Sequence, residues 1–348
     1  MVAGYSGPPT LPATTVKSSL QQPAVTVVVP TLAADDALEA CLDSLTRQTW
    51  RDFEVIVVDN STRGLVTPRD GVRIIHNDRN VGFGAAVNQA IRASGAPFIA
   101  TLNDDAVACP GWLHALVSAV TERPEIGMVA SQVRLSGEPL LDSAGMLIAR
   151  DGSSKQRGHR KPVESYSLRQ DTLFPSGSAA LYRREMLDEI GLFDDSFFLY
   201  CEDTDLGLRG RWAAWECLYE PAAMVEHRYS HSAGRASELK AYYVERNRLS
   251  VVVKNFPASM LWKAPFHSIV RYYWHAAYAR KGQGAAAAYK NTGGKSLGAL
   301  VWRAHLDCVR RLPRLWKQRR AIRRRLTSKQ FRHLLLEHSI TGREVAAL

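Results

Sequence analysis

The stretch FIATLNDD, residues Phe98 to Asp105, decides the fold: it is an apolar, β-prone run that stops on an amide and two carboxylates. Such a run is typical of a buried strand in a parallel sheet. Asn103, Asp104 and Asp105 would then lie at the carboxyl end of that strand, where open α/β sheets bind ligands. Neighbouring carboxylates repel each other unless a cation or donors hold them, and oxygen ligands suit Mg²⁺ or Mn²⁺. A solvated Asn-Asp turn is the alternative for this stretch alone.

Apolar runs alternate with helical patterns on both sides of this stretch. VTVVVPT (residues 25–31), FEVIVVDNS (53–61) and IGMVASQVRL (126–135) are predicted to be strands, with helices between them. This alternation predicts an α/β fold with a Rossmann-like, mostly parallel sheet flanked by helices. Three strand ends are polar, at Pro30-Thr31, at Asp59-Asn60-Ser61 and at residues 103–105. We expect them to converge on one edge of the sheet, as in a nucleotide-binding crevice.

A glycine-containing turn, RNVGFG, precedes a predicted helix at residues 85–93. Its backbone N–H groups and Arg79 would lie near the same edge, at a helix N-terminus suited to anionic groups. It is not the dinucleotide-binding fingerprint, because that motif follows the first strand, whereas here the first strand is followed by Leu32 and Ala33. A hydride-transfer enzyme is therefore disfavoured.

A second acidic group lies in FFLYCEDTDLGLRGRW, residues 197–212. Acids at the start of a helix often only cap it, and this accounts for at least one of Glu202 and Asp205. One carboxylate here is nevertheless a candidate general base towards a sugar hydroxyl. His227 follows a later predicted strand, and it is a candidate metal ligand that would complete an oxygen-nitrogen set with Asp105.

Composition limits the class of protein. The chain has 348 residues, of which 46% are hydrophobic and 23% charged, which is ordinary for a globular protein. It has no apolar run of the roughly 20 residues that a membrane-spanning helix needs and no secretory signal pattern. Its five cysteines are scattered without metal-ligand spacing, which favours a reducing cytoplasm.

Residues 303–332 hold 12 Lys or Arg and a single acid, Asp307, so this segment carries the whole net charge of +11. Apolar residues interleave with the basic ones in LPRLWKQRRAIRRRL, and aromatic residues recur upstream in SMLWKAPFHSIVRYYWHAAYA. This pattern favours helices that lie on an anionic membrane surface. Packing on the domain or on a second subunit is the alternative. Nucleic acid is disfavoured, because no recognition module accompanies the basic segment.

Taken together, VIVVDNS, NVGFGAAVN, LNDDA, GSAALYRRE, GLFDDSFFLYCEDTDLGLRGR, PAAMVEH and YYVERNRL resemble glycosyltransferase family 2, and especially its bacterial rhamnosyltransferase-like branch. The resemblance covers roughly residues 25–257. It implies a GT-A fold and inverting transfer from a dTDP- or UDP-sugar, assisted by Mg²⁺ or Mn²⁺.

The resemblance also assigns roles to residues of this chain. It places Pro30, Thr31, Asp59, Asn80, Gly82, Asn103 and Asp104 at the nucleotide sugar, Asp105 and His227 on the metal, and Asp203 with its neighbour Glu202 at the catalytic base. Asn103 stands where many members have Asp. The pair Arg246-Asn247 matches a recurrent pair for which either packing beneath the site or contact with the substrate is possible.

We therefore expect a flexible leader at residues 1–22, a GT-A domain at 23–257 with a nucleotide-sugar half (23–135) and an acceptor half (136–257), and a helical basic region at 258–348. The enzyme would work at the inner face of the cell membrane on a polyprenyl-linked or polysaccharide acceptor. Rhamnose is the leading donor sugar. A UDP-hexose transferase and a non-catalytic nucleotide-sugar-binding scaffold are the alternatives, and a homo-oligomer is compatible with the basic region.

Overall fold

The computed structural model describes residues 22–33, 36–228, 237–290 and 296–348, so nearly all of the expected leader lies outside the described residues. A mixed sheet of ten strands forms its centre, in the order β10-β12-β6-β11-β4-β1-β2-β3, with β5 paired to β12 and β7 to β6. The bounds are β1 Val25–Thr31, β2 Phe53–Asp59, β3 Val72–His76, β4 Phe98–Leu102, β5 Ala106–Ala108, β6 Ile126–Leu135, β7 Leu141–Ser143, β10 Gln170–Asp171, β11 Ala179–Arg183 and β12 Glu216–His227.

The sheet confirms the predicted α/β architecture. Strands β1 to β4 are parallel, and β12 is parallel to β6, whereas β11 runs antiparallel between β4 and β6. Residues of β1 alternate between the two faces, with Val27 and Val29 in one core cluster and Val28 in the other. Helices α1 (Ala37–Thr46) and α3 (Trp112–Thr121) cover the first face, and α2 (Phe83–Ala93), α4 (Arg184–Ile190) and α5 (Glu202–Trp212) cover the second.

The predicted convergence of polar strand ends is also confirmed. Thr31 of β1 is paired with Asp59 of β2, and Val28 of β1 with Thr101 of β4. The loop after β4 therefore returns towards the end of β1, where the Thr31 hydroxyl donates a hydrogen bond of 2.6 Å to Asp104 Oδ2. The parallel register thus delivers three polar segments to one edge of the sheet.

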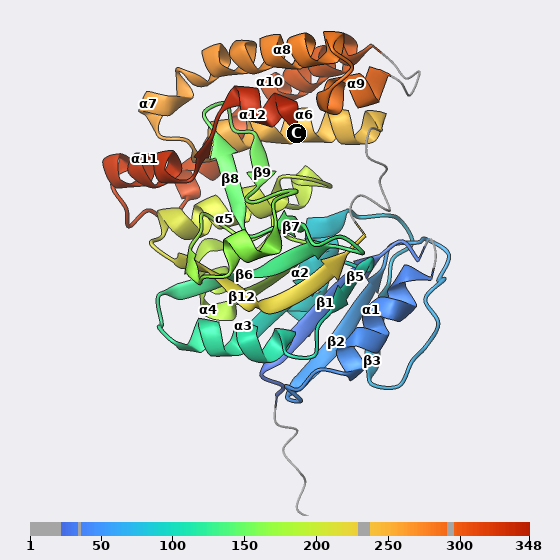
Figure 1. Ribbon diagram of the computed structural model, residues 1–348. Helices are drawn as coiled ribbons and strands as arrows, with labels where there is room; N and C mark the ends of the chain where they lie inside the picture. Colours follow the sequence, from blue (N-terminus) through green and yellow to red (C-terminus); the bar gives the residue numbers. More distant parts are fainter. Residues whose placement is uncertain (1–21, 34–35, 229–236, 291–295) are drawn as a thin grey trace, which may run out of the picture.

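The C-terminal third is helical and stands over that sheet domain as a separate layer (Figure 1). We call α6, α8, α9, α10 and α12 the helical cap. A small sheet of β8, β9 and β13 rises from the sheet domain to meet the cap. The bounds are β8 Met146–Ala149, β9 Ser154–Gln156, α6 Glu238–Asn255, α7 Ala258–Leu261, α8 Ala264–Arg280, α9 Gly284–Lys290, α10 Leu297–Ala321, α11 Ser328–Glu337, β13 Ser339–Ile340 and α12 Gly342–Ala347; the 3₁₀ turns are η1 Val163–Tyr166 and η2 Asp195–Phe197.

The basic segment packs on the sheet domain and on α6. Leu315 is only 2% exposed, which corrects the expectation that it would lie on lipid. Arg319 donates to the Val253 carbonyl at 2.9 Å, and Arg325 lies 2.8 Å from Glu189. Further along, the ring of Phe331 stacks on Trp212 at 3.8 Å. The alternative of packing on the domain is therefore confirmed for these residues, because guanidinium groups satisfy backbone carbonyls and carboxylates there.

Gly82 adopts a φ of +86° at the start of α2, and a Cβ at this position would lie 2.1 Å from the Phe198 carbonyl oxygen. The neighbouring Phe83 N–H donates to that same oxygen at 2.8 Å. Gly82 therefore allows the turn before α2 to contact the segment that leads into α5. A side chain there would push two parts of the site apart.

We expect Gly82→Ala to lower the free energy of unfolding by about 1–3 kcal/mol more than Gly71→Ala, the range for overpacking a tight contact. Gly71 is the matched control, because it also has a positive φ, of +74°, but has nothing within 4 Å of the added Cβ. Urea unfolding followed by tryptophan fluorescence measures both. Equal losses would mean that the contact with Phe198 contributes nothing.

Candidate active site

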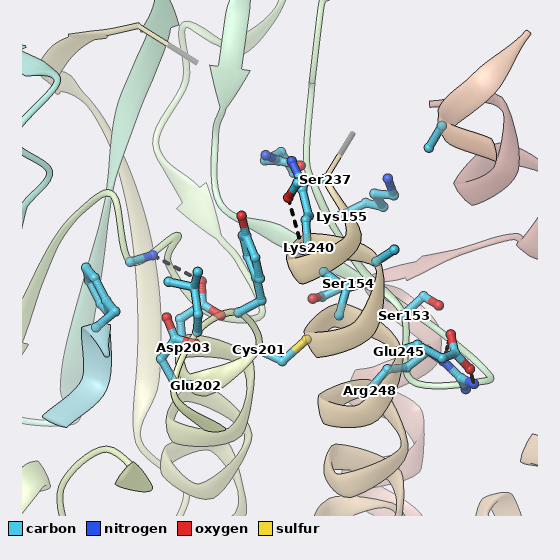
Figure 2. Close-up of a pocket in the computed structure, with 18 of the residues that line it drawn as sticks. Ser153, Ser154, Lys155, Cys201, Glu202, Asp203, Ser237, Lys240, Glu245 and Arg248 are labelled. Carbon is cyan, nitrogen blue, oxygen red and sulfur yellow. Dashed lines mark hydrogen bonds and ion pairs between the residues drawn. The ribbon is translucent and has the colours of Figure 1, made fainter. Parts of the chain in front are cut away.

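The candidate residues meet in one pocket of about 1100 Å³, which runs from the sheet edge to the helical cap. Asp105, after β4, and Asp203, in the first turn of α5, both line it. Figure 2 shows Glu202 and Asp203 at the start of a helix beside this pocket. The residues predicted from sequence that line it are Pro30, Thr31, Asn80, Gly82, Asn103, Asp104, Asp105, Glu202, Asp203 and His227.

Asp59 is placed differently, beneath the pocket and not on its wall. It is 1% exposed, and its carboxylate accepts hydrogen bonds from the Ser61 and Val66 backbone N–H groups and contacts His76 at 3.2 Å. These hydrogen bonds lower its pKa although burial opposes them. Its neighbour Asn60 lines the pocket instead. In this arrangement Asp59 shapes the loop after β2. Asn60, which the sequence places at the same strand end without a role at the nucleotide sugar, is the residue that reaches the pocket.

His227, at the end of β12, lies between two carboxylates. His227 Nε2 lies 3.1 Å from Asp105 Oδ1, and its Nδ1 lies 2.8 Å from Asp142 Oδ2. Burial favours the neutral imidazole, but the two flanking carboxylates outweigh it and raise the pKa of His227 to about 10. Asp142 was not predicted from the sequence; a carboxylate inside the apolar run LLDSAGMLI is a signal that could have indicated it.

The arrangement of Asp105, His227 and Asp142 is suited to binding a divalent cation. The buried Asp105 Oδ1 has no hydrogen-bond partner of good geometry in the described part of the chain. A carboxylate behind the far nitrogen of a histidine ligand is the usual second-shell arrangement of metal sites. No cluster of three or more His, Cys, Asp or Glu side chains able to hold a metal occurs among residues 22–33, 36–228, 237–290 and 296–348. Asp105 and His227 would thus leave coordination positions for phosphate oxygens, as is usual for Mg²⁺.

The first turn of α5 presents two carboxylates with different environments. Asp203 accepts hydrogen bonds from the Gly177 N–H at 3.1 Å and the Thr204 N–H at 2.6 Å. Burial raises the pKa of Asp203, and these hydrogen bonds oppose the rise. Burial and the charge of Asp203 raise the pKa of Glu202 well above its usual range, and Glu202 Oε2 has no partner among the described residues. The hydrogen bonds to Asp203 therefore favour its ionised form, whereas burial and the neighbouring charge favour the neutral form of Glu202.

The segment leading into α5 is strained. Phe198, Tyr200 and Cys201 all have positive φ, between 64° and 67°, a conformation that non-glycine residues rarely adopt. Asn247 holds the segment: its Nδ2 lies 2.7–2.9 Å from the carbonyl oxygens of Phe197, Leu199 and Tyr200. Arg246 also donates to the Phe197 carbonyl at 2.8 Å. The role that the sequence left open for Arg246-Asn247 is thus to support the turn beneath the site.

The comparisons with known proteins agree with this geometry. Residues 26–191 match the model of "Glycosyl transferase family 2". The chain is 31% identical over 277 residues to the N-acetylglucosaminyl-diphospho-decaprenol L-rhamnosyltransferase of Mycobacterium tuberculosis, covering 70% of this chain and 88% of that protein. The chain belongs to glycosyltransferase family 2. It is therefore a glycosyltransferase that uses a nucleotide sugar.

Solved structures support the GT-A fold of this family 2 enzyme. The mannosyltransferase PcManGT from Pyrobaculum calidifontis, solved with GDP-Man and Mn²⁺, superposes with a TM-score of 0.52 at 17% identity, covering 86% of this chain and 89% of that chain. GalNAc-T7, solved with UDP, GalNAc and Mn²⁺, gives a TM-score of 0.55 at 14% identity, covering 83% of this chain and 55% of that chain. At these identities the likeness concerns the fold alone.

The Asp142 carboxylate should govern metal affinity without touching the metal. We expect Asp142→Asn to weaken Mn²⁺ binding by about 10–100-fold, the range for the loss of a second-shell partner. Isothermal titration with Mn²⁺ in the presence of UDP or dTDP measures this. Asp171→Asn is the control, because Asp171 pairs with Arg211 outside the pocket. Unchanged affinity in Asp142→Asn would exclude His227 as a ligand positioned by Asp142.

Proposed function

We propose that this family 2 enzyme is an inverting glycosyltransferase that moves a sugar, with rhamnose the leading choice, from a dTDP- or UDP-sugar to a lipid-linked or cell-envelope glycan acceptor. The observation that carries the proposal is the shared pocket of Asp105 and Asp203. A single displacement needs a leaving group held on one side of the anomeric carbon and a base on the other. Asp105 and His227 would meet the first need and Asp203 the second, and all three line one cavity.

On the donor side, the chain supplies oxygen ligands and backbone donors. Asp105 and His227 would hold Mg²⁺ or Mn²⁺, which when bound neutralises the negative charge that grows on the diphosphate as the glycosidic bond breaks. Asn103 and Asp104 lie beside them, and Asp104 is fixed by Thr31. Asn80 accepts from the Gly82 N–H at 2.9 Å, which sets the turn that faces the nucleotide.

On the acceptor side, Asp203 is the proposed general base. Its ionised form would take the proton from the acceptor hydroxyl as that oxygen attacks the anomeric carbon. Burial and the charge of Asp203 raise the pKa of Glu202, which favours its neutral form and leaves Asp203 as the proposed proton acceptor at the start of α5. The result is inversion in one step without a covalent sugar-enzyme intermediate.

A similar protein and the surface of this chain both support a proposal for the acceptor. The Mycobacterium tuberculosis protein is named for a diphospho-decaprenol acceptor, and we propose a polyprenyl-linked acceptor here. No helix in the described part of the chain is both long and apolar enough to span a membrane. We therefore infer that the enzyme reaches its acceptor by lying on the anionic membrane surface.

The surface that we propose for that contact runs from Trp262, at the end of α7, along α8. Trp262, Phe266, Ile269 and Tyr273 are 84%, 65%, 65% and 64% exposed, and their spacing places them along one side of the helical stretch. Trp and Tyr favour the headgroup region, and exposed apolar side chains at helical spacing suit an interfacial helix. Lys263, which follows Trp262, is exposed and would favour anionic lipid.

Two other functions remain as alternatives. A UDP-hexose transferase would use the same groups, so thermal shifts with dTDP-rhamnose, UDP-galactose and UDP-glucose distinguish the donors, since a tight ligand raises the melting temperature. A non-catalytic scaffold would bind a nucleotide sugar without turnover. Glu202 is buried and Asp203 half-buried in one helical turn. Desolvating two adjacent carboxylates is unfavourable, and a role in proton transfer accounts for the pair, which favours the enzyme.

Asp203→Asn should bind the donor normally and lose turnover by about 10²-fold or more, the usual contribution of a general base. Sugar transfer is measured with Mn²⁺ and a prenyl-diphosphate-linked sugar, and donor affinity is measured by titration. Asp188→Asn, an exposed acid of α4 outside the pocket, is the control. Because the pKa of Asp203 is raised, wild-type activity should fall on acidification at a higher pH than an ordinary aspartate dictates. Full turnover in Asp203→Asn would remove Asp203 from this role.

Trp262→Ser with Phe266→Ser should reduce sedimentation with phosphatidylglycerol vesicles, since both side chains would lose apolar contact with the lipid. Leu168→Ser is the control, because Leu168 is 75% exposed but lies in the sheet domain. Donor affinity should be the same in all three proteins. Equal vesicle binding by the double variant and the wild type would place the membrane contact elsewhere.

A further inference from the structure

The pocket extends beyond Asp203 into the helical cap, where small apolar side chains form part of its wall beside Tyr289 and Lys290. Ala276 and Ala279 of α8, Ala285 and Ala286 of α9, and Val301 of α10 line this part, which we call the alanine chamber. The total volume of about 1100 Å³ is at the upper end of what one small ligand fills. The nucleotide sugar is expected at the other end, by Asp105 and His227. The chamber is thus available to a second molecule.

Lys155 lies between the first turn of α5, which carries Asp203, and the alanine chamber. It lies in β9, whose preceding residue, Ser154, is joined to Thr204 of α5 by a hydrogen bond of 2.9 Å between their hydroxyls. Side chains alternate along a strand, so Lys155 faces away from Thr204. Its partner on β8 is Leu147, which packs with Ile340 and Val345 beside the cap. Figure 2 shows Lys155 and Lys240 beside α6, on the other side of the pocket from Asp203.

Among the described residues, the carboxylates near Lys155 are paired with arginines, so none of them forms an ion pair with this lysine. Arg271 pairs with Asp151 at 2.5 Å and with Glu245 at 2.8 Å, and Glu245 also pairs with Arg248. Those four groups satisfy one another, whereas Lys155 makes no hydrogen bond through its side chain and no ion pair in the part of the chain that the structure describes. Burial, together with the positive charges of Lys240 and Arg271, lowers the pKa of Lys155 to about 8.

We propose that Lys155 binds the diphosphate of a lipid-linked acceptor whose first isoprenoid units lie in the alanine chamber. This rests on the proposed function, in which the acceptor is polyprenyl-linked. The order of groups along the pocket matches the order of groups in such a molecule: Asp203 for the sugar hydroxyl, Lys155 for the diphosphate and the chamber for the chain. An anion would offset the repulsion between Lys155 and its cationic neighbours.

The donor also carries a diphosphate, so the experiment must separate the two sources. Farnesyl diphosphate is the probe for the acceptor side, and UDP or dTDP with Mn²⁺ is the probe for the donor side; binding of both is measured by isothermal titration on the full chain. We expect Lys155→Ala to weaken farnesyl diphosphate by about 10–100-fold, the range for one hydrogen bond to a charged group. Its affinity for the nucleotide should be unchanged. Lys161→Ala, an exposed lysine outside the pocket, should bind both like the wild type.

The pH dependence gives a second readout. The charged or titratable groups around Lys155 are Lys240 and Glu245 of α6, Arg271 and His275 of α8, Lys290 of α9, and Asp151 before β9. His275 is neutral at pH 7, because burial and the cations lower its pKa to about 4. As the pH rises from 7 to 9, Lys155 loses its proton, so farnesyl diphosphate binding should weaken in the wild type. Lys155→Arg should keep its binding at pH 9, because guanidinium stays charged.

The outcomes separate this inference from the proposed function. Loss of nucleotide binding in Lys155→Ala with intact farnesyl diphosphate binding would assign Lys155 to the donor and overturn the inference. Unchanged binding of both probes by a folded Lys155→Ala would overturn it as well, with folding checked by the urea midpoint. Farnesyl diphosphate binding is measured without turnover, so it is independent of the transfer assay. If the wild type transfers no sugar, the proposed function is contradicted. A weaker affinity of Lys155→Ala for farnesyl diphosphate would still support the inference.

Discussion

The site depends on one constrained turn. Phe198, Tyr200 and Cys201 hold left-handed backbone conformations immediately before α5, and such strain persists only where the surroundings over-determine it. The Asn247 amide donates hydrogen bonds to three carbonyl oxygens of this turn. Arg246 donates to the carbonyl oxygens of Ser196 and Phe197. Helix α6 of the cap thereby sets the direction in which the first turn of α5 points its carboxylates. Without that support Glu202 and Asp203 would not face the sheet edge.

The same helix also links the turn to the charge network of the interior. Lys254 of α6 lies 2.7 Å from Asp194 and 2.9 Å from Asp205, and Asp205 pairs with Arg209 one turn further along α5. Buried charges are tolerated only when they are paired and hydrogen-bonded. This requirement ties α5, α6 and the segment before the turn into one arrangement. The helical cap therefore supports the turn that carries Glu202 and Asp203, and it also lines the far part of the same pocket.

Parts of the site were predictable from sequence because they follow from the chain's own periodicity. FIATLNDD and VTVVVPT are apolar runs that stop on polar residues, and parallel pairing brings such stops together. Asp59 shows the limit of that reasoning: it was predicted to contact the nucleotide, but two backbone N–H groups and His76 occupy its carboxylate beneath the surface. A strand end predicts which residues reach the edge of a sheet. It does not predict which of them turn inwards.

The sequence by itself determined the α/β class, the edge of the sheet at which polar residues collect, and the acidic start of α5, since each depends on local pattern and on strand pairing of neighbouring segments. Only the tertiary structure decided the partners that come from far along the chain. Asp142 meets His227 across 85 residues, Asn247 reaches Tyr200 across 47, and Ser154 meets Thr204 across 50. The basic segment is the clearest case: its pattern suits a membrane surface, yet Leu315 is buried against the protein. An amphipathic pattern specifies that one side must be covered, and the packing of the whole chain decides what covers it.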